Sequence, residues 1–210
     1  MVTIDQIKEL RTITGAGVGA VREALETTNG DVAEAIKFLR AKGLAKAGKR
    51  KGKVAEHGIL GTYIHSNKKF VVVVEVACET DFAAKSEDMN KFANDLAVHI
   101  AAVNPKYISV SSIDKDTLAN ELSAAESGLD NKPDEIRKTI INGKLEKFYQ
   151  EVVLLKQTLF TDESKTVEDY QNEMVAKIGE KIEITQFYKF QVGEPVVSNT
   201  AAPEEEVTEE

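Results

Sequence analysis

The sequence lacks the features that most often mark a secreted or membrane-bound chain. Its 210 residues include one cysteine, Cys78, so no internal disulfide can form and a reducing compartment is expected. The longest apolar run, 70–74, is far shorter than the roughly 20 residues that cross a bilayer. No basic stretch followed by an apolar stretch marks the beginning as a signal peptide. We therefore expect a cytoplasmic protein that does not enter a membrane.

Motifs for catalysis and cofactor binding are missing as well. His57, His65 and His99 lie on different predicted elements, and no HxxH or CxxC spacing occurs, so we expect no metal site. No GxGxxG or GxxxxGK[ST] loop is present to hold a phosphate. Tryptophan is absent and aromatic residues make up 6% of the chain, so no basic and aromatic stripe suggests base stacking. The sequence thus favours a protein-binding module without a cofactor over an enzyme or a nucleic-acid binder.

Charge is plentiful but unevenly distributed. The net charge of −8 divides into +5 for residues 1–53, −8 for residues 54–200 and −5 for the last ten, which read as a solvated acidic tail. Such asymmetry can steer the encounter with a partner. The stretch 42–53 holds six basic residues and no acidic one. It is interpreted either as a soluble linker or as a contact surface for an acidic partner or ribosomal RNA.

The chain opens with the pattern of three short helices. Thr3 with Gln6, and Asp31 with Glu34, have the spacing of capping boxes. The turn "TGAG" supplies glycines that can take a positive φ, and Gly43 suits the position that ends the third helix. A compact three-helix bundle is feasible at this length.

A sheet and a long helix are predicted next. Apolar runs at 57–65 and 70–78 flank a short loop that contains Ser and Asn, which predicts a hairpin. The positions of Met89, Phe92, Ala93, Leu96, Ile100 and Val103 fall on one helical stripe that Pro105 ends, and this stripe is expected to face the core.

Further elements complete the predicted fold. The stretch 112–148 reads as two helices with thin apolar stripes, 149–157 as a strand, 166–179 as a capped helix and 182–192 as a final alternating strand. The predicted fold class is α+β, in which a three-helix module precedes an antiparallel sheet of roughly four strands with helices on one face.

The junction "ETDF" after the second strand raises a question of its own, because it places Asp81 and Phe82 at the start of a helix. A local interpretation is that Thr80 or Asp81 caps the helix and Phe82 packs against its first turns. A functional interpretation is that Phe82 is an exposed anchor at the centre of an interface, with a charge beside it. The residues alone leave both open.

Four stretches together resemble the translation elongation factor Ts family, nucleotide-exchange partners of the GTPase elongation factor Tu. They are "LRTITGAGVGAVREAL", "NGDVAEAIKFLRAKGLAKAGKR", "VEVACETDFAAK", and "KLEKFYQEVVLLKQ" with "IGEKIEITQFYKFQVGE". They span essentially residues 1–194 in order, and the TDF junction after an apolar strand is the most specific of them. The chain resembles the short form of the family, with one core rather than two in tandem.

The resemblance implies a domain organisation and a partner. It implies a non-enzymatic, cytoplasmic exchange factor that binds elongation factor Tu with GDP and promotes GDP release so that GTP can rebind. It further implies a homodimer, with no cofactor, no membrane contact and no stable nucleic-acid binding. The implied parts are a UBA-like domain at 1–43, a basic linker at 44–55, a core and dimerisation domain at 56–196 that includes a coiled-coil hairpin at 112–148, and a disordered acidic tail at 197–210.

The resemblance also assigns roles to single residues. The loop that would enter beside the magnesium and phosphate site of Tu comprises Thr80, Asp81, Phe82 and Ala83. The implied contacts of the helical domain are Leu10, Arg11, Val18 and Arg22, and His65 matches a histidine that the family uses near the same groove. The family commonly has Met-Met-Asp after TGAG, where this chain has Val18, Gly19 and Ala20, which thins the apolar contact. Ala83 replaces the usual Val.

Overall fold

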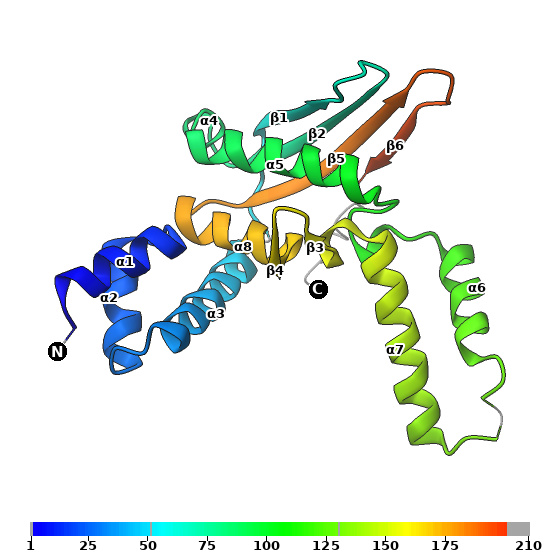
Figure 1. Cartoon of the computed structure of the whole chain (residues 1–210), viewed down its shortest axis with the longest axis horizontal. Helices are drawn as coiled ribbons and strands as arrows, with labels where there is room; N and C mark the ends of the chain where they lie inside the picture. Colours follow the sequence, from blue (N-terminus) through cyan, green and yellow to red (C-terminus); the bar gives the residue numbers. More distant parts are fainter. Residues whose placement is uncertain (1, 51, 130, 201–210) are drawn as a thin grey trace, which may run out of the picture. The chain divides into compact units, whose positions relative to one another are not determined.

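The structure is a computed structural model that describes residues 2–50, 52–129 and 131–200. Three helices precede an antiparallel sheet packed with helices, so the α+β class predicted from the sequence is confirmed at this level (Figure 1). The elements are α1 Ile4–Thr14, α2 Val18–Thr27, α3 Val32–Arg50, β1 His57–Ile64, β2 Phe70–Cys78, α4 Asp81–Ala84, α5 Glu87–Val103, η1 Val110–Ser112, α6 Lys115–Glu126, α7 Asp134–Val152, η2 Leu154–Lys156, β3 Thr158–Leu159, β4 Asp162–Thr166, α8 Val167–Ile178, β5 Ile182–Gln191 and β6 Val197–Thr200.

The chain divides into two compact units. The first contains the chain up to Leu60, together with Val76–Ala93 and Glu168–Glu183. The second contains Gly61–Glu75, Asn94–Val167 and the chain from Ile184 onward. Within the described ranges, no helix combines the length and the apolar character needed to cross a bilayer.

In the first unit, α1, α2 and α3 enclose a small core of their own. Thr3 and Gln6 form the predicted capping box of α1, and Gly15 ends that helix with a φ of 65°. The Asp31 carboxylate accepts a hydrogen bond from the backbone N–H of Glu34 at 2.9 Å, as expected of a residue that caps α3. The fully buried residues of this cluster are Leu10, Val21, Ala24, Leu25 and Ala35.

The predicted end of the third helix at Gly43 is wrong, because α3 continues to Arg50. A Cβ atom added at Gly43 would lie 3.3 Å from the Cβ of Ala176 on α8, which is tighter than ordinary van der Waals contact. Gly43 therefore serves close packing of two helices rather than helix termination. Residues 44–50 of the predicted linker 44–55 accordingly belong to a helix. Lys51, the next residue, lies outside the described residues.

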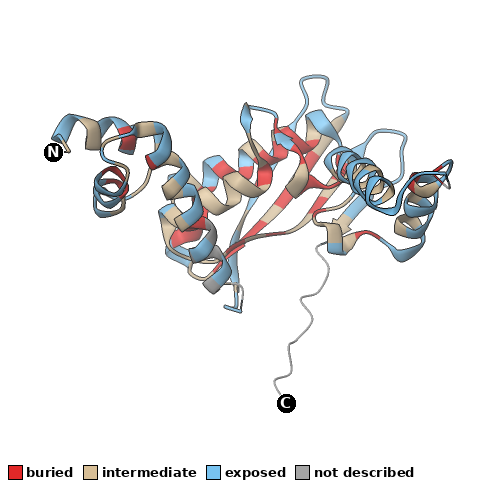
Figure 2. Ribbon diagram, turned by 90° about the horizontal axis from the view of Figure 1, so that it is seen from below, coloured by how far each residue is buried: buried red, intermediate tan, exposed pale blue. Residues whose placement is uncertain are grey.

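The main sheet of the described residues has the strand order β1-β2-β5-β6, and the predicted hairpin of β1 and β2 is present. Val72, Val74, Val76 and Cys78 are buried on one face of β2. The predicted stripe of α5 is buried from Met89 to Ile100, whereas Val103 is exposed. Figure 2 shows in red where buried residues lie along the strands and helices.

The last strands differ from the prediction in two respects. Ile182 and Ile184 are buried as expected, but the alternation then shifts by one residue, so that Phe187 and Lys189 are buried instead of their neighbours. A short strand, β6, pairs antiparallel with β5, although 197–200 was predicted to belong to the disordered tail. Residues 201–210 of that tail lie outside the described residues.

The predicted strand at 149–157 is wrong. α7 runs on to Val152, a 3₁₀ turn follows, and the short hairpin of β3 and β4 begins only at Thr158. Val153 and Leu154 are nevertheless fully buried, and Val153 forms an isolated bridge with Tyr107. A short apolar run fits a buried helix end as well as a strand, and here the helix end is realised.

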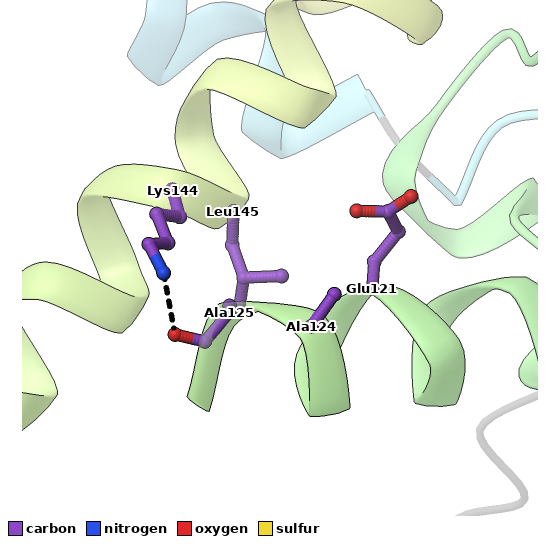
Figure 3. Close-up of a pocket in the computed structure, with 5 residues that line it drawn as sticks. All are labelled: Glu121, Ala124, Ala125, Lys144 and Leu145. Atoms are coloured by element: carbon purple, nitrogen blue, oxygen red, sulfur yellow. Dashed lines mark hydrogen bonds between the residues drawn. The ribbon is translucent and has the colours of Figure 1, made fainter. Parts of the chain in front are cut away.

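In the second unit, α6 and α7 pack side by side, and the helices predicted within 112–148 are present (Figure 1). The Lys144 ammonium donates to the carbonyl of Ala125 at 3.0 Å, next to a small pocket that Glu121, Ala124 and Leu145 also line (Figure 3). α7, all of whose residues are described, buries none of them completely. The two helices thus share only a thin apolar contact.

His99 is a fully buried titratable group of this unit. Its Nδ1 accepts a hydrogen bond from the Phe160 N–H at 3.1 Å, so its Nε2 donates to the Gln157 side-chain oxygen at 3.0 Å. The ring is therefore neutral in the fold. Burial lowers the pKa of His99 below its ordinary value of 6.5, and the hydrogen bond with Gln157 opposes this only in part.

We predict that the free energy of unfolding falls as the pH drops below about 6.5 and continues to fall through the lowered pKa of folded His99. The unfolded chain binds the proton first, because its histidine has the higher pKa. His99→Gln should cost about 1–3 kcal/mol at neutral pH but flatten this pH dependence. Urea titrations between pH 7.5 and 5.5 measure both effects, with the exposed His57→Gln as control. A His99→Gln protein with the wild-type slope would contradict the assignment.

Candidate functional site

The junction between β2 and α5 is built on a helix of four residues. Thr80 is the N-cap of α4, and its hydroxyl accepts from the backbone N–H of Ala83 at 3.3 Å. Ser86 ends this turn, and its hydroxyl accepts from the N–H of Met89 at 3.2 Å, which starts α5. The sequence predicted one helix here, and the structure has two.

Phe82 projects away from its own protein. Its exposed fraction is 90%, the largest of any large apolar side chain among the described residues, whereas Ala83 is only 6% exposed. The local interpretation is therefore confirmed for the cap by Thr80 and wrong for the packing of Phe82. Ala83, assigned by resemblance to the contact loop, instead faces the protein interior and supports the turn.

Asp81 is exposed beside Phe82 and is held by its own helix. The Lys85 ammonium donates to the Asp81 carboxylate at 2.5 Å. This hydrogen bond, more than the smaller effect of the nearby His57, lowers the pKa of Asp81 below its ordinary range. The site thus presents an ionised carboxylate and an unburied phenyl ring on adjacent residues.

Two carboxylates connect this turn to the segment between α8 and β5. Glu180 accepts from the backbone N–H of Thr80 at 3.0 Å and from its hydroxyl at 2.7 Å. In the opposite direction, Glu79 accepts from the backbone N–H of Lys181 at 2.6 Å. We refer to Glu79, Thr80, Glu180 and Lys181 as the carboxylate clamp.

Arg50, the last residue of α3, extends the clamp. Its guanidinium donates to both carboxylate oxygens of Glu79, at 2.8 and 3.0 Å. The hydrogen bond from Lys181 and then that from Arg50 lower the pKa of Glu79. Sequence reasoning missed Arg50, Glu79 and Glu180, because no spacing in a single sequence pairs residues that lie 29 or about a hundred positions apart.

The helical residues assigned by resemblance fall into two groups. Leu10 is fully buried in the three-helix core, which contradicts a role for it as a contact residue. Arg11 and Arg22 are exposed, and Arg22 forms an ion pair with Glu26 at 2.7 Å. Val18 is 51% exposed at the start of α2. Ile13, which the sequence analysis did not single out, is another exposed apolar residue of these helices.

His65 belongs to the second unit and is exposed after β1. Its Nδ1 shares a hydrogen bond of 3.0 Å with the hydroxyl of Tyr63. In the part of the chain that the structure describes, no three His, Cys, Asp or Glu side chains are grouped to bind a metal ion. The first unit instead combines hydrogen-bonded support with an exposed aromatic residue, an arrangement typical of a protein contact.

Comparisons with known proteins cover nearly the whole chain. A family model described as elongation factor TS matches residues 2–194. The elongation factor Ts of Geotalea uraniireducens is 46% identical over 198 residues, which are 92% of this chain and 90% of the relative. That of Moorella thermoacetica is 43% identical over 201 residues, which are 95% of this chain and 99% of the relative. That of Geobacter sulfurreducens is 41% identical over 195 residues, covering 92% and 90%.

The different positions of Leu10 and Arg11 generate a prediction. Leu10→Ala should lower the free energy of unfolding by about 2–5 kcal/mol, because it leaves a cavity among three helices. Arg11→Ala, one position along and exposed, should change it by less than about 0.5 kcal/mol. Urea unfolding followed by circular dichroism measures both. Equal losses in the two variants would contradict the burial of Leu10.

Proposed function

The chain belongs to the elongation factor Ts family, the nucleotide-exchange factors of elongation factor Tu, and we propose how its residues perform that exchange. It is a non-enzymatic factor, so it makes and breaks no covalent bond. The proposal is that Phe82 and Asp81 enter elongation factor Tu beside its magnesium and phosphate site and thereby favour the nucleotide-free state. GTP then rebinds. We infer that this takes place in the cytoplasm, where the family works.

The observation that carries this proposal is the exposure of Phe82. A phenyl ring loses about 1.5–3 kcal/mol when it is left in water rather than buried, so a ring that is 90% exposed on an ordered turn is available for a partner. In an apolar slot between two helices of the GTPase, the ring would displace the helix that supports the metal ligands. The GTPase holds GDP through backbone amides, a lysine and Mg²⁺, all of which depend on exact placement.

Asp81 acts next to that ring by charge. Its carboxylate is ionised at neutral pH, as an exposed aspartate is with or without a lowered pKa, and Lys85 holds it in a defined position. A negative charge brought near this site competes with the phosphates for the attraction of the cation. The two adjacent residues therefore combine an apolar and an electrostatic effect.

Phe82 alone does not suffice for exchange. Moving a two-state population from 1:99 to 99:1 requires about 5.5 kcal/mol of differential affinity, about twice what one phenyl ring supplies. Other surfaces must bind the nucleotide-free state more tightly as well. We propose Arg11, Val18 and Arg22 for this role in the helical module, and His65 in the core.

Binding is reciprocal, because the factor by which this protein lowers the affinity for GDP is the factor by which GDP lowers the affinity for this protein. A high nucleotide concentration therefore releases the factor from its partner, and the cycle can repeat.

We also infer the domain organisation that the family implies. Residues 1–43 would act as a UBA-like module, which the separate core of α1, α2 and α3 supports. Residues 44–55 would join it to a core at 56–196, in which α6 and α7 form a coiled-coil hairpin. The thin contact between these two helices supports an excursion from the core rather than a part of it.

We predict that Phe82→Ala lowers the rate of GDP release from elongation factor Tu roughly ten- to a hundredfold. Its free energy of unfolding should stay within about 0.5 kcal/mol of wild type, because the ring makes little contact at home. Release of fluorescent GDP measures the rate. Phe160→Ala removes another exposed ring, in the second unit, and serves as the matched control. Wild-type exchange by Phe82→Ala would refute the proposed insertion.

We further propose that the chain forms a homodimer through the second unit, where several apolar side chains are exposed on or beside the strands. They are Ile64, Phe190, Val192, Val196 and Val197. A two-fold symmetric contact would bury the same patch on both copies.

Light scattering at micromolar concentration should give twice the chain mass of 23.0 kDa. Val192→Glu should shift the mass toward the monomer, because it places a charge in the apolar contact. Val54→Glu, at an equally exposed position of the first unit, should not. A monomeric mass for the unaltered chain would refute the dimer.

A further inference from the structure

We propose that Glu180 is the positioning residue for Asp81 and Phe82, and that it sets the efficiency of exchange without touching the partner. The inference rests on the proposed function, because it assigns a second residue to the same insertion. The turn cannot position these side chains unaided. α4 has only four residues, and helices shorter than roughly 12 residues are marginal in water without outside support.

The support begins at the hydroxyl of Thr80. A hydroxyl has one hydrogen to donate and lone pairs to accept with. Here the hydrogen goes to Glu180 at 2.7 Å, which leaves a lone pair free to accept the Ala83 N–H at 3.3 Å. Glu180 therefore fixes the rotation of the hydroxyl that caps α4. Its second oxygen binds the Thr80 N–H at 3.0 Å and fixes the backbone as well.

The segment that carries Glu180 is itself constrained. Gly179 follows α8 with a φ of 83°, a conformation that favours glycine, and its N–H donates to the carbonyl of Val175 at 2.9 Å. On the other side of Glu180, Lys181 donates its backbone N–H to the Glu79 carboxylate. Glu180 is thus held from both sides and offers its carboxylate in one direction.

Arg50 completes the arrangement through Glu79. The paired hydrogen bonds at 2.8 and 3.0 Å join the end of α3 to the residue before Thr80. Both bonds come from one guanidinium nitrogen, Nη1, and such charge-assisted hydrogen bonds are stronger than those between neutral groups. The turn that presents Phe82 is therefore connected by side chains to α3 and to the end of α8.

A purely structural role for Glu180 is the competing explanation. In that case its loss would reduce the amount of folded protein, and a higher total concentration would restore full exchange. A positioning role differs, because the folded protein would bind the GTPase and yet place Phe82 poorly. The concentration dependence of exchange separates the two.

The first experiment measures GDP release against the concentration of the factor. Glu180→Ala should lower the plateau rate about tenfold, as expected for the loss of hydrogen bonds to a charged group, with the half-saturating concentration little changed. Glu180→Gln keeps one acceptor oxygen, so its plateau rate should lie between those of the wild type and Glu180→Ala. Glu183→Ala is the matched control, because Glu183 binds the Lys181 ammonium at 3.0 Å and not Thr80. A wild-type plateau for Glu180→Ala would overturn the proposal.

A double-mutant cycle identifies the residue through which Glu180 acts. If it positions Phe82, then adding Glu180→Ala to Phe82→Ala should lower the plateau rate by much less than tenfold, because the two changes are coupled. Full additivity would overturn the positioning role. If Glu180→Ala alone fails to fold by circular dichroism, Glu180→Gln takes its place in the cycle.

The second experiment needs no partner. The chain has no tryptophan, so Phe82→Trp introduces a single tryptophan, at the site, whose emission reports on this position alone. Its fluorescence anisotropy should fall when Glu180→Ala is added and should not fall with Glu183→Ala. Unchanged anisotropy would overturn the proposed ordering of the turn. If Phe82→Ala exchanged normally, the proposed function would fail, while this measurement would still decide whether Glu180 orders the turn.

Discussion

The hydrogen bonds between Thr80 and Glu180 are the constraint on which the presentation of Phe82 depends. A phenyl ring in water tends toward burial, and a flexible loop would let it collapse onto its own protein. The cap and the burial of Ala83 and Ala84 prevent this, because they orient the turn so that position 82 faces outward. The exposure of Phe82 is therefore a consequence of the helix cap at Thr80 and of the burial of Ala83 and Ala84. The ring itself contributes nothing to the fold.

The first unit also has a common support for the surfaces that we propose as contacts. On α8, Lys177 donates to Asp88 at 2.6 Å, and Ala176 lies against Gly43 of α3. Arg40, also on α3, lies 3.7 Å from Glu173. One helix thus contacts both the long helix of the amino-terminal module and the region that follows Phe82. Exchange requires differential binding by more than one surface, and surfaces joined through a shared helix can act on the GTPase together.

Local patterns in the sequence predicted much of this structure. The errors lie where a residue far away in the sequence determines the local conformation or burial. Capping boxes and helical stripes involve residues three or four positions apart, so Thr3 with Gln6 and the stripe of α5 were predicted correctly. Gly43 was misread because its reason is Ala176 on another helix. The candidate site shows the same difference between local and distant features. Phe82 stands out in the sequence, whereas its support by Glu180 spans a hundred positions.

The shifted alternation of β5 also depends on residues far away in the sequence. Here the residue concerned is a cation, Lys189, whereas Glu180 is an anion. Lys189 is buried because its ammonium donates to the side chain of Asn104 at 2.5 Å and to the carbonyl of Pro105 at 3.0 Å, just beyond the end of α5. Burial lowers the pKa of Lys189, and the nearby Lys106 lowers it further. A cation suits a helix C-terminus, as a carboxylate suits an N-terminus. The Glu180 carboxylate lies at the beginning of α4, and the Lys189 ammonium lies just beyond the end of α5. Each charge is therefore near the helix end that favours it. Lys189 therefore breaks the alternation of β5 because its charge meets polar groups just beyond a helix end.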